Sequence, residues 1–247
     1  MINFTKYLND ETIGPVVTFI LHLMAFDKGE SRDKDSRSFV KQFIQVNGMS
    51  LFVRFQLLKT TQETSLIESC NLLSQIAKHS KEVYEFIDSI EPFDDLKRLI
   101  IHQNPEIRSR ILNLIGNMCR HSGYFYKKLN QHGLLKHCIS LCEDPDKTIK
   151  KFACVAIGNA SFHDDSLYEQ LRPAIPILVS LLKDPEEKTR SNAAAALGNL
   201  SRNSSMLDKD FINTGANYQL VSMLSQDKSN AAKKVSIMAV INLLELP

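Results

Sequence analysis

One pattern occurs three times in this chain: as NPEIRSRILNLIGNM from Asn104, as DPDKTIKKFACVAIGNA from Asp144 and as DPEEKTRSNAAAALGNL from Asp184. The proline at the second position recurs at intervals of 40 residues, and each copy contains a Gly-Asn pair, at 116/117, 158/159 and 198/199. A period of about 40 residues is typical of helical repeats that stack on one another. Stacked repeats form an elongated rod, so the pattern predicts a long binding surface rather than a catalytic pocket.

The pattern extends in both directions from the three copies. Gln75 lies 42 residues before Asn117, and Asn242 lies 43 residues after Asn199, each within a similar apolar pattern. Five repeats are therefore expected, near 38–80, 81–122, 123–162, 163–203 and 204–247. Together they make up one predicted domain, 38–247.

Each long helical pattern is preceded by two shorter ones. A residue that favours a turn separates each shorter pair, namely Gly48, Pro92, Gly133, Pro176 or Gly215. Three helices per repeat favour the armadillo repeat over the two-helix HEAT repeat. The predicted fold is therefore all-α, an armadillo-repeat right-handed superhelical solenoid.

Three polar residues are expected to begin the third helices of their repeats: Asn104, Asp144 and Asp184. Each side chain can accept hydrogen bonds from the free amides of the first turn. The proline that follows occupies a position where no amide hydrogen is needed.

Residues 1–37 differ from the repeats. Ile13–Phe26 is an apolar pattern that predicts one helix, which we expect to cap the end of the solenoid. The segment that follows, DKGESRDKDSR from Asp27 to Arg37, consists mainly of charged residues and is expected to form a solvated loop.

The composition argues against several classes of protein. A hydrophobic content of 43% indicates a folded chain, and a formal net charge of +2 is too small for the dense positive field of nucleic-acid binding. Thr18 and His22 interrupt the longest apolar run, so neither a secretory signal nor a membrane span is expected. The five cysteines are odd in number and have apolar neighbours, which indicates core thiols in a reducing, cytoplasmic compartment.

The strongest functional signal is a row of amides at equivalent positions of the predicted third helices: Gln75, Asn117, Asn159, Asn199 and Asn242. Third helices line the concave face of an armadillo solenoid. An amide both donates and accepts hydrogen bonds, so the row is expected to pair with the backbone of an extended partner segment, roughly one amide every three residues. The alternative is that these amides tie neighbouring helices together.

A second row lies three residues after the amides, and its members are Lys78, Arg120, Phe162, Arg202 and Glu245. Cations around an aromatic side chain would suit an acidic peptide with a hydrophobic anchor. The alternative is a set of solvated helix ends, because cations near a helix C-terminus also interact favourably with the helix dipole.

Metal binding and catalysis find little support. His132, His137, Cys138 and Cys142 are close in sequence, but His137 and Cys138 are adjacent and point to different sides of a helix, whereas a zinc site needs converging ligands. His163, Asp164 and Asp165 fall in a predicted loop with no nucleophile beside them. No metal, cofactor or catalytic residue is predicted.

The segment from Phe152 to Leu207 resembles the C-terminal armadillo region of Fused-family serine/threonine kinases, most closely in AIGNASFHDDSLYEQL and KTRSNAAAALGNLSRNS. The resemblance implies helical repeats joined to a kinase domain. It also implies roles in Hedgehog-type signalling, in motile cilia or in cytokinesis, commonly with kinesin-like partners. The expected location is the cytoplasm, and within it the cilium, the axoneme or the cytoskeleton.

This chain lacks the motifs of a kinase. It has no glycine-rich phosphate loop, no VAIK-like lysine strand, no HRD and no DFG, all of which phosphoryl transfer requires. The chain is therefore predicted to be a protein-binding scaffold of a ciliary, cytoskeletal or Hedgehog-type assembly and not an enzyme. The alternative is a regulatory C-terminal module of a Fused-like kinase that docks on its own catalytic domain.

Two further expectations concern the partner. Nuclear-import adaptors also carry an asparagine row, but they pair it with tryptophans that form slots for lysine; this chain has no tryptophan, so basic cargo is disfavoured. The last predicted helix contains four apolar residues that no following repeat is expected to cover, Ile237, Val240, Ile241 and Leu244. Such an apolar end invites assembly into a large complex.

Overall fold

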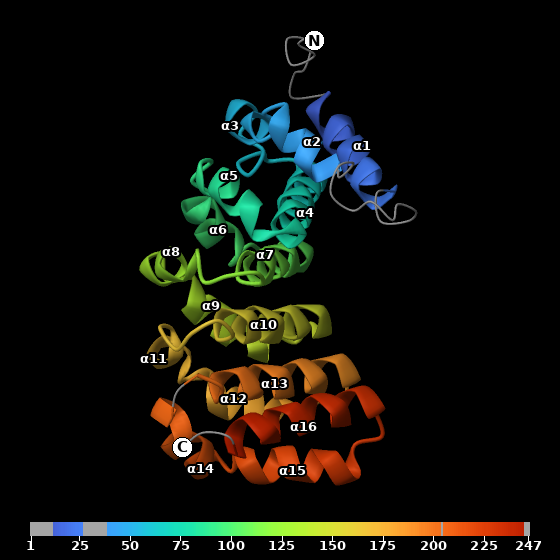
Figure 1. Cartoon of the computed structure of the whole chain (residues 1–247). Coiled ribbons are helices and arrows are strands. Elements are labelled where there is room, and N and C mark those ends of the chain that lie inside the picture. The colour runs from blue at the N-terminus through green and yellow to red at the C-terminus, as the bar shows by residue number, and fades with distance from the viewer. Residues whose placement is uncertain (1–11, 27–38, 204, 245–247) are drawn as a thin grey trace.

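The structure, a computed structural model, describes residues 12–26, 39–203 and 205–244, and these residues form helices without a strand. The helices stack along one axis into a rod, from α1 (Ile13–Phe26) at one end to α16 (Asn230–Leu244) at the other (Figure 1). None of the described helices is both long enough and apolar enough to cross a membrane. The charged segment from Asp27 to Arg37 lies outside the described residues.

The helices fall into five consecutive units. The first contains α2 (Phe39–Gln45), α3 (Ser50–Arg54) and α4 (Glu63–His79). The second contains η2 (Lys81–Val83), α5 (Tyr84–Asp88), α6 (Phe93–Leu99) and α7 (Pro105–Met118). The third contains α8 (Tyr126–Gln131), α9 (Leu134–Ser140), η3 (Leu141–Glu143) and α10 (Lys147–Ala160). The fourth contains α11 (Tyr168–Leu171), α12 (Ala174–Leu181) and α13 (Glu187–Leu200), and the fifth contains η4 (Ser205–Leu207), α14 (Asp208–Thr214), α15 (Ala216–Gln226) and α16.

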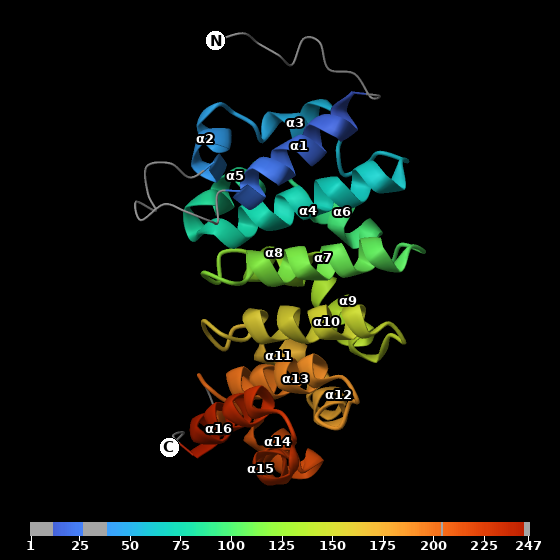
Figure 2. The ribbon, with the colours of Figure 1, turned by 90° about the vertical axis from the view of Figure 1, so that its right-hand side faces the viewer.

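The long third helices α4, α7, α10, α13 and α16 lie side by side as successive layers (Figure 2). Each packs against the next, and α1 packs against α4 as one more layer at the N-terminal end. The shorter helices lie behind this layer and close the core from the other side (Figure 2). One side of the rod is therefore made of third helices alone.

The core follows from the spacing of apolar residues along the helices. In α7, Ile107, Ile111, Leu114, Ile115 and Met118 recur at intervals of three and four residues, which places them on one side of the helix, and all are fully buried. The five cysteines are buried as well. Burial raises the pKa of the Cys70 and Cys138 thiols to about 12, so they behave as small apolar side chains.

Glycine sets the distance between the third helices. A Cβ added at Gly158 would lie 3.4 Å from Ala196 Cα, an ordinary contact, whereas one added at Gly198 would lie 2.8 Å from Ala239 Cα. The backbones of α13 and α16 therefore approach so closely that no side chain fits between them. α16 has Ile241 at the position of these glycines, and its side chain is exposed, as is that of Leu244, at 78%.

Turns between the first and second helices agree only partly with the sequence. Gly133 and Gly215 have φ values of 67° and 68°, a backbone conformation that glycine adopts readily, and each stands between two short helices. The expected turn at Pro176 was wrong, because this residue lies in the first turn of α12. Pro173 stands before α12 instead, where its missing amide hydrogen costs nothing.

The expected helix start is confirmed at Asn104 and wrong at Asp144 and Asp184. Asn104 caps α7 and accepts from the Glu106 amide at 2.9 Å. The other two aspartates lie in a turn before their helices, because each accepts from the amide two residues later at 2.8 Å. α10 is capped by Asp146 instead, and α13 begins after Glu186.

Candidate partner-binding face

The third helices expose the same positions in every unit, except that Asn117 is buried in the second. Residues three, four, seven and eleven apart lie on one side of a helix, and counting from the amide row these positions are +3, 0, −4, −7 and −11. We call this strip the third-helix face. On α10 its members are Phe162, Asn159, Val155, Phe152 and Thr148, and all are at least partly exposed.

The asparagines of the amide row lie at equivalent positions of the stack. Their side-chain nitrogens donate hydrogen bonds within the stack. The Nδ2 groups of Asn159, Asn199 and Asn242 donate to the carbonyl oxygens of Gly116, Gly158 and Gly198 on the preceding third helix, at 2.7, 2.8 and 2.8 Å. Each asparagine therefore links one repeat to the repeat before it. The Oδ1 atoms of these three side chains accept no hydrogen bond within the described part of the chain.

The first two members of the row differ in detail. Asn117 is 7% exposed and donates to the Ser74 hydroxyl at 2.9 Å and, more weakly, to the Ser74 carbonyl at 3.3 Å. Gln75 is partly exposed at the equivalent position of α4. The nitrogens of Asn117, Asn159, Asn199 and Asn242 are thus structural, and the oxygens of the last three are what the row can offer a partner.

Three tyrosines that the sequence analysis missed close the ends of the third helices. Tyr84, Tyr126 and Tyr168 recur at intervals of 42 residues. Each hydroxyl donates to the carbonyl of the row asparagine in its own repeat, that is, of Asn117, Asn159 and Asn199. Each also accepts from the backbone amide four residues after that asparagine, at 3.1 to 3.4 Å. The regular spacing was the signal that could have identified them.

These hydroxyls sit among apolar groups. Burial raises the pKa of Tyr84 to about 12, and it raises the pKa values of Tyr126 and Tyr168 as well. The hydroxyl is held in its neutral form, which is the form that can donate to the carbonyl. The side chain of Tyr84 is fully buried, so this contact belongs to the core.

The fourth position after each amide adds another bond between repeats. Nε2 of His121 lies 2.9 Å from the Lys78 carbonyl, and Nε2 of His163 lies 3.1 Å from the Cys119 carbonyl. Asn203 at the equivalent position donates to the Phe162 carbonyl at 3.2 Å. The C-terminal ends of successive third helices are therefore bonded to one another.

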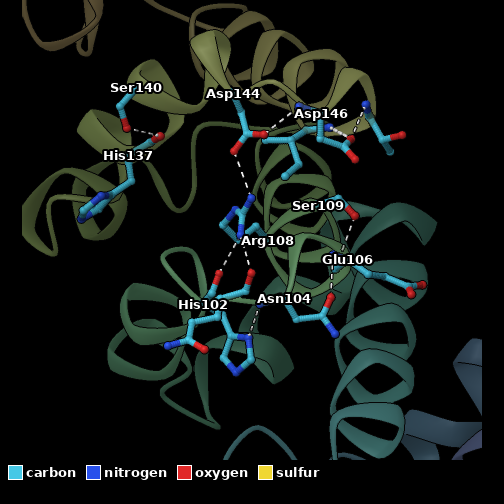
Figure 3. Close-up of polar contacts among 12 residues, drawn as sticks. His102, Asn104, Glu106, Arg108, Ser109, His137, Ser140, Asp144 and Asp146 are labelled. Atoms are coloured by element: carbon cyan, nitrogen blue, oxygen red, sulfur yellow. Dashed lines mark hydrogen bonds and ion pairs between the residues drawn. The ribbon is translucent and has the colours of Figure 1, made fainter.

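Charged pairs bind the other ends of the third helices. Arg108 of α7 donates to Asp144 at 3.1 Å and to the carbonyls of His102 and Gln103 at 2.9 Å (Figure 3). Lys150 with Asp184 and Arg190 with Asp227 repeat this arrangement along the rod. The Arg190 guanidinium lowers the pKa of the Asp227 carboxyl. Both ends of each helix are fixed, which makes the third-helix face a rigid platform.

The second row, at position +3, is exposed. Lys78, Arg120 and Arg202 are exposed, and Phe162 is 39% exposed between the two arginines in the order of the repeats. The Arg202 guanidinium lies 4.3 Å from the centre of the Phe162 ring. The His163 ring meets Phe162 edge-on at 5.1 Å. Phe162 is therefore held in place while part of its ring still faces solvent.

On α10 the middle of the face is apolar. Val155 and Phe152 continue from Phe162 along α10, and the Lys151 ammonium lies 4.3 Å from the centre of the Phe152 ring. A hollow of about 310 Å³ opens between α7 and α10, lined by Pro105, Glu106, Ser109, Arg110, Asp146, Thr148 and Phe152. The face can therefore accept both apolar and charged groups.

The histidines and cysteines near residue 135 do not converge. Cys138 and Cys142 are buried, whereas His132 lies 3.1 Å from Asp94 and stacks on Phe93. Within the described residues there is no group of His, Cys, Asp or Glu side chains that could hold a metal ion.

Comparisons with known proteins identify the fold. The armadillo/β-catenin-like repeat family matches residues 171–202. The crystal structure of an engineered protein has a TM-score of 0.83 at 19% identity and covers 96% of this chain and 92% of its own. A designed armadillo repeat protein in complex with the peptide (KR)4 has a TM-score of 0.79 at 19% identity, with 92% of each chain covered. The prediction of an all-α armadillo solenoid is confirmed.

One curated protein gives a partial match. The serine/threonine-protein kinase TIO of Arabidopsis thaliana is 41% identical over 59 residues, which make up 24% of this chain. The match spans 4% of the length of that kinase. The chain thus has an armadillo region similar to part of a serine/threonine kinase, and the narrower resemblance to the Fused family stays a prediction.

Proposed function

We propose that this chain is a protein-binding scaffold that holds an extended segment of a partner along its third-helix face. One observation carries the proposal: hydrogen bonds and ion pairs fix the third helices to one another at both ends, while side chains of the third-helix face remain exposed to solvent. A rigid surface costs little ordering free energy when a partner binds. A designed armadillo protein of the same fold was solved with a peptide, which supports this use of the fold.

In this proposal the backbone of the partner meets the Oδ1 atoms of Asn159, Asn199 and Asn242. Their nitrogens already bond within the stack, so the row offers acceptors to the amide hydrogens of the partner. Phe162, with the Arg202 guanidinium stacked on it, supplies an apolar contact. The backbone contact gives affinity, and the flanking side chains give specificity.

The assembly that we propose is ciliary, cytoskeletal or of the Hedgehog type, within the cytoplasm. The likeness between Phe152–Leu207 and Fused-family kinases supports it, as does the partial match to TIO. The partners that we propose for such an assembly are kinesin-like, axonemal or microtubule-associated proteins. The exposed end of α16, with Ile237, Ile241 and Leu244, would join the chain to its neighbours in such a complex.

A second candidate is a regulatory module of a serine/threonine kinase. The match to TIO favours it, because it links this armadillo region to part of a kinase. In that case the segment on the third-helix face would belong to the catalytic domain of the same polypeptide.

Photo-crosslinking in cells tests the proposal. A photoreactive residue is placed at Lys188, which is exposed on the third-helix face of α13, and in separate variants at Lys136 of α9 and at Tyr218 of α15. Mass spectrometry then identifies the crosslinked segments. We expect the Lys188 variant to capture a defined segment of another protein or of a kinase domain, and the Lys136 variant to capture none. Capture from Lys136 or Tyr218 without capture from Lys188 would reject the third-helix face as the binding surface.

A further inference from the structure

The described arginines from Arg98 onward fall into two groups. Arg98, Arg108, Arg110, Arg172 and Arg190 each contact a carboxylate. Arg120 and Arg202 contact none within the described part of the chain, and both are exposed. They occupy the same position, three residues after the amide, in the turns that follow α7 and α13.

The two arginines frame one aromatic residue. Phe162 has the equivalent position on α10, the helix between α7 and α13 (Figure 2). The Arg202 guanidinium stacks on its ring at 4.3 Å, which limits the orientations of both side chains. An arginine whose orientation is limited in this way loses less conformational entropy when it binds a carboxylate through two parallel hydrogen bonds.

The charges around the row favour an acidic ligand. Lys78 continues the row on α4, and it forms no ion pair among the described residues. The acidic side chains of the face, Glu68 and Glu106, lie more than two helical turns before the row, and Glu106 pairs with Arg110. Among the described residues, the +3 positions are therefore cationic around Phe162, while Asp164 and Asp165 lie in the loop that follows it; Glu245, at the fifth +3 position, lies outside the described residues.

We propose that the row of Arg120, Phe162 and Arg202 binds an acidic segment of a partner protein, with a carboxylate at each arginine and an apolar side chain at Phe162. This inference rests on the proposed function and specifies the chemistry of the partner. Neighbouring packed helices lie about 8–10 Å apart, so the backbone positions of the two arginines are about 16–20 Å apart, and the Arg202 guanidinium reaches from there to the Phe162 ring. An extended chain advances about 3.3 Å per residue, so two acids about five or six positions apart, with an apolar residue between them, match these backbone positions.

The experiment uses a fluorescein-labelled peptide with this spacing, Ser-Glu-Gln-Ser-Leu-Gln-Ser-Glu-Ser, and the full chain. Fluorescence polarisation measures the Kd at low and at high salt. We expect saturable binding that weakens as salt rises, because exposed ion pairs are screened. Replacing both glutamates of the peptide by glutamine, or its leucine by serine, should raise the Kd at least tenfold. A peptide with lysine in place of both glutamates should not bind.

Protein variants test the same contact from the other side. Arg120→Gln with Arg202→Gln should raise the Kd of the glutamate peptide at least tenfold. The matched control is Lys127→Gln with Lys136→Gln, which removes the same charge from exposed positions of α8 and α9 and should leave the Kd within about twofold of the parent. Circular dichroism on both variants checks that the helices are unchanged.

Three results would overturn the inference: no saturable binding of the glutamate peptide, equal binding of the glutamine peptide, or equal loss of affinity in the control variant. Its failure is distinguishable from that of the proposed function. If Lys188 still captures a partner segment in cells while the peptide does not bind, the scaffold stands and the acidic partner is rejected.

Discussion

At the scale of single residues, the same amide side chain can bind a partner or link two helices. The sequence alone could therefore predict where the amides lie but not which of the two they do. The spacing located Asn117, Asn159, Asn199 and Asn242 correctly as equivalent positions. It did not decide between binding a partner and linking helices, because both use the same side chain. The structure shows that the nitrogens link helices, a choice that depends on the distance to the neighbouring carbonyl rather than on residue type.

The first prediction concerns one of these links. Asn159→Ala removes the donor to the Gly116 carbonyl and should lower the free energy of unfolding by about 1–2 kcal/mol, the usual cost of a lost partly buried hydrogen bond. Urea unfolding followed by circular dichroism measures it. Asn130→Ala, at an exposed position of α8, is the control and should change stability by less than about 0.5 kcal/mol. Equal effects of the two substitutions would argue against the link.

The second prediction concerns the tyrosine hydroxyls. The pKa of Tyr84 is raised to about 12, from an ordinary value near 10 in an unfolded chain. A raised pKa favours the neutral form in the folded state, so this contribution to stability is complete below about pH 10 and is lost as the pH rises through about 12. Thermal unfolding between pH 8 and 12 should show this decline. In Tyr84→Phe the protein should be less stable at pH 8 and should show a smaller decline; an identical pH profile would contradict the assignment.

At the scale of helices, the periodic pattern predicted correctly which helices exist. It was less accurate for the residues at which they begin. The expected helix α1 and the three helices of each unit appear in the structure. The starts of α10 and α13 were misplaced, because an aspartate before a proline can cap a helix or close a turn ahead of it, and both use the same side-chain oxygen. The neighbouring repeat decides: Arg108 and Lys150 hold these aspartates in the turn.

The third prediction compares two glycines at equivalent positions. Gly198→Ala places a methyl group 2.8 Å from Ala239 Cα on the next backbone, so it should destabilise the chain by about 1–3 kcal/mol through overpacking. Gly158→Ala meets its neighbour at 3.4 Å and gains about 1 kcal/mol of helix propensity, so it should be neutral or slightly stabilising. Denaturant midpoints of the two variants test this. The reverse order would show that α13 and α16 are not packed this closely.

At the scale of the whole molecule, the period of about 40 residues predicted the rod and its third-helix face, because equivalent side chains of stacked repeats must line up. The network that fixes the face was harder to predict. It joins residues 31 to 44 positions apart, such as Tyr168 with Asn199 and His163 with Cys119, so no local sequence pattern identifies the partners. The 42-residue interval between the tyrosines could have been found in the sequence, whereas the contact between Arg202 and Phe162 is visible only in the structure.

The rod leaves two surfaces for partners, the third-helix face and the exposed end of α15 and α16. The end exposes the apolar and aromatic side chains of Tyr218, Ile241 and Leu244. The face combines a fixed backbone, the Oδ1 acceptors of Asn159, Asn199 and Asn242, and two arginines without a carboxylate within the described residues. We therefore propose that a partner segment binds the third-helix face and not the exposed end.

The fourth prediction, and the most direct test of that assignment, is a map of backbone amide chemical shifts of the isotope-labelled chain, recorded while the Ser-Glu-Gln-Ser-Leu-Gln-Ser-Glu-Ser peptide is added. We predict that the largest changes cluster at Arg120, Phe162 and Arg202 and along the row of Asn159 and Asn199, with none on α8 or α9. Changes centred on α15 and the outer side of α16, or no changes at saturating peptide, would contradict the account.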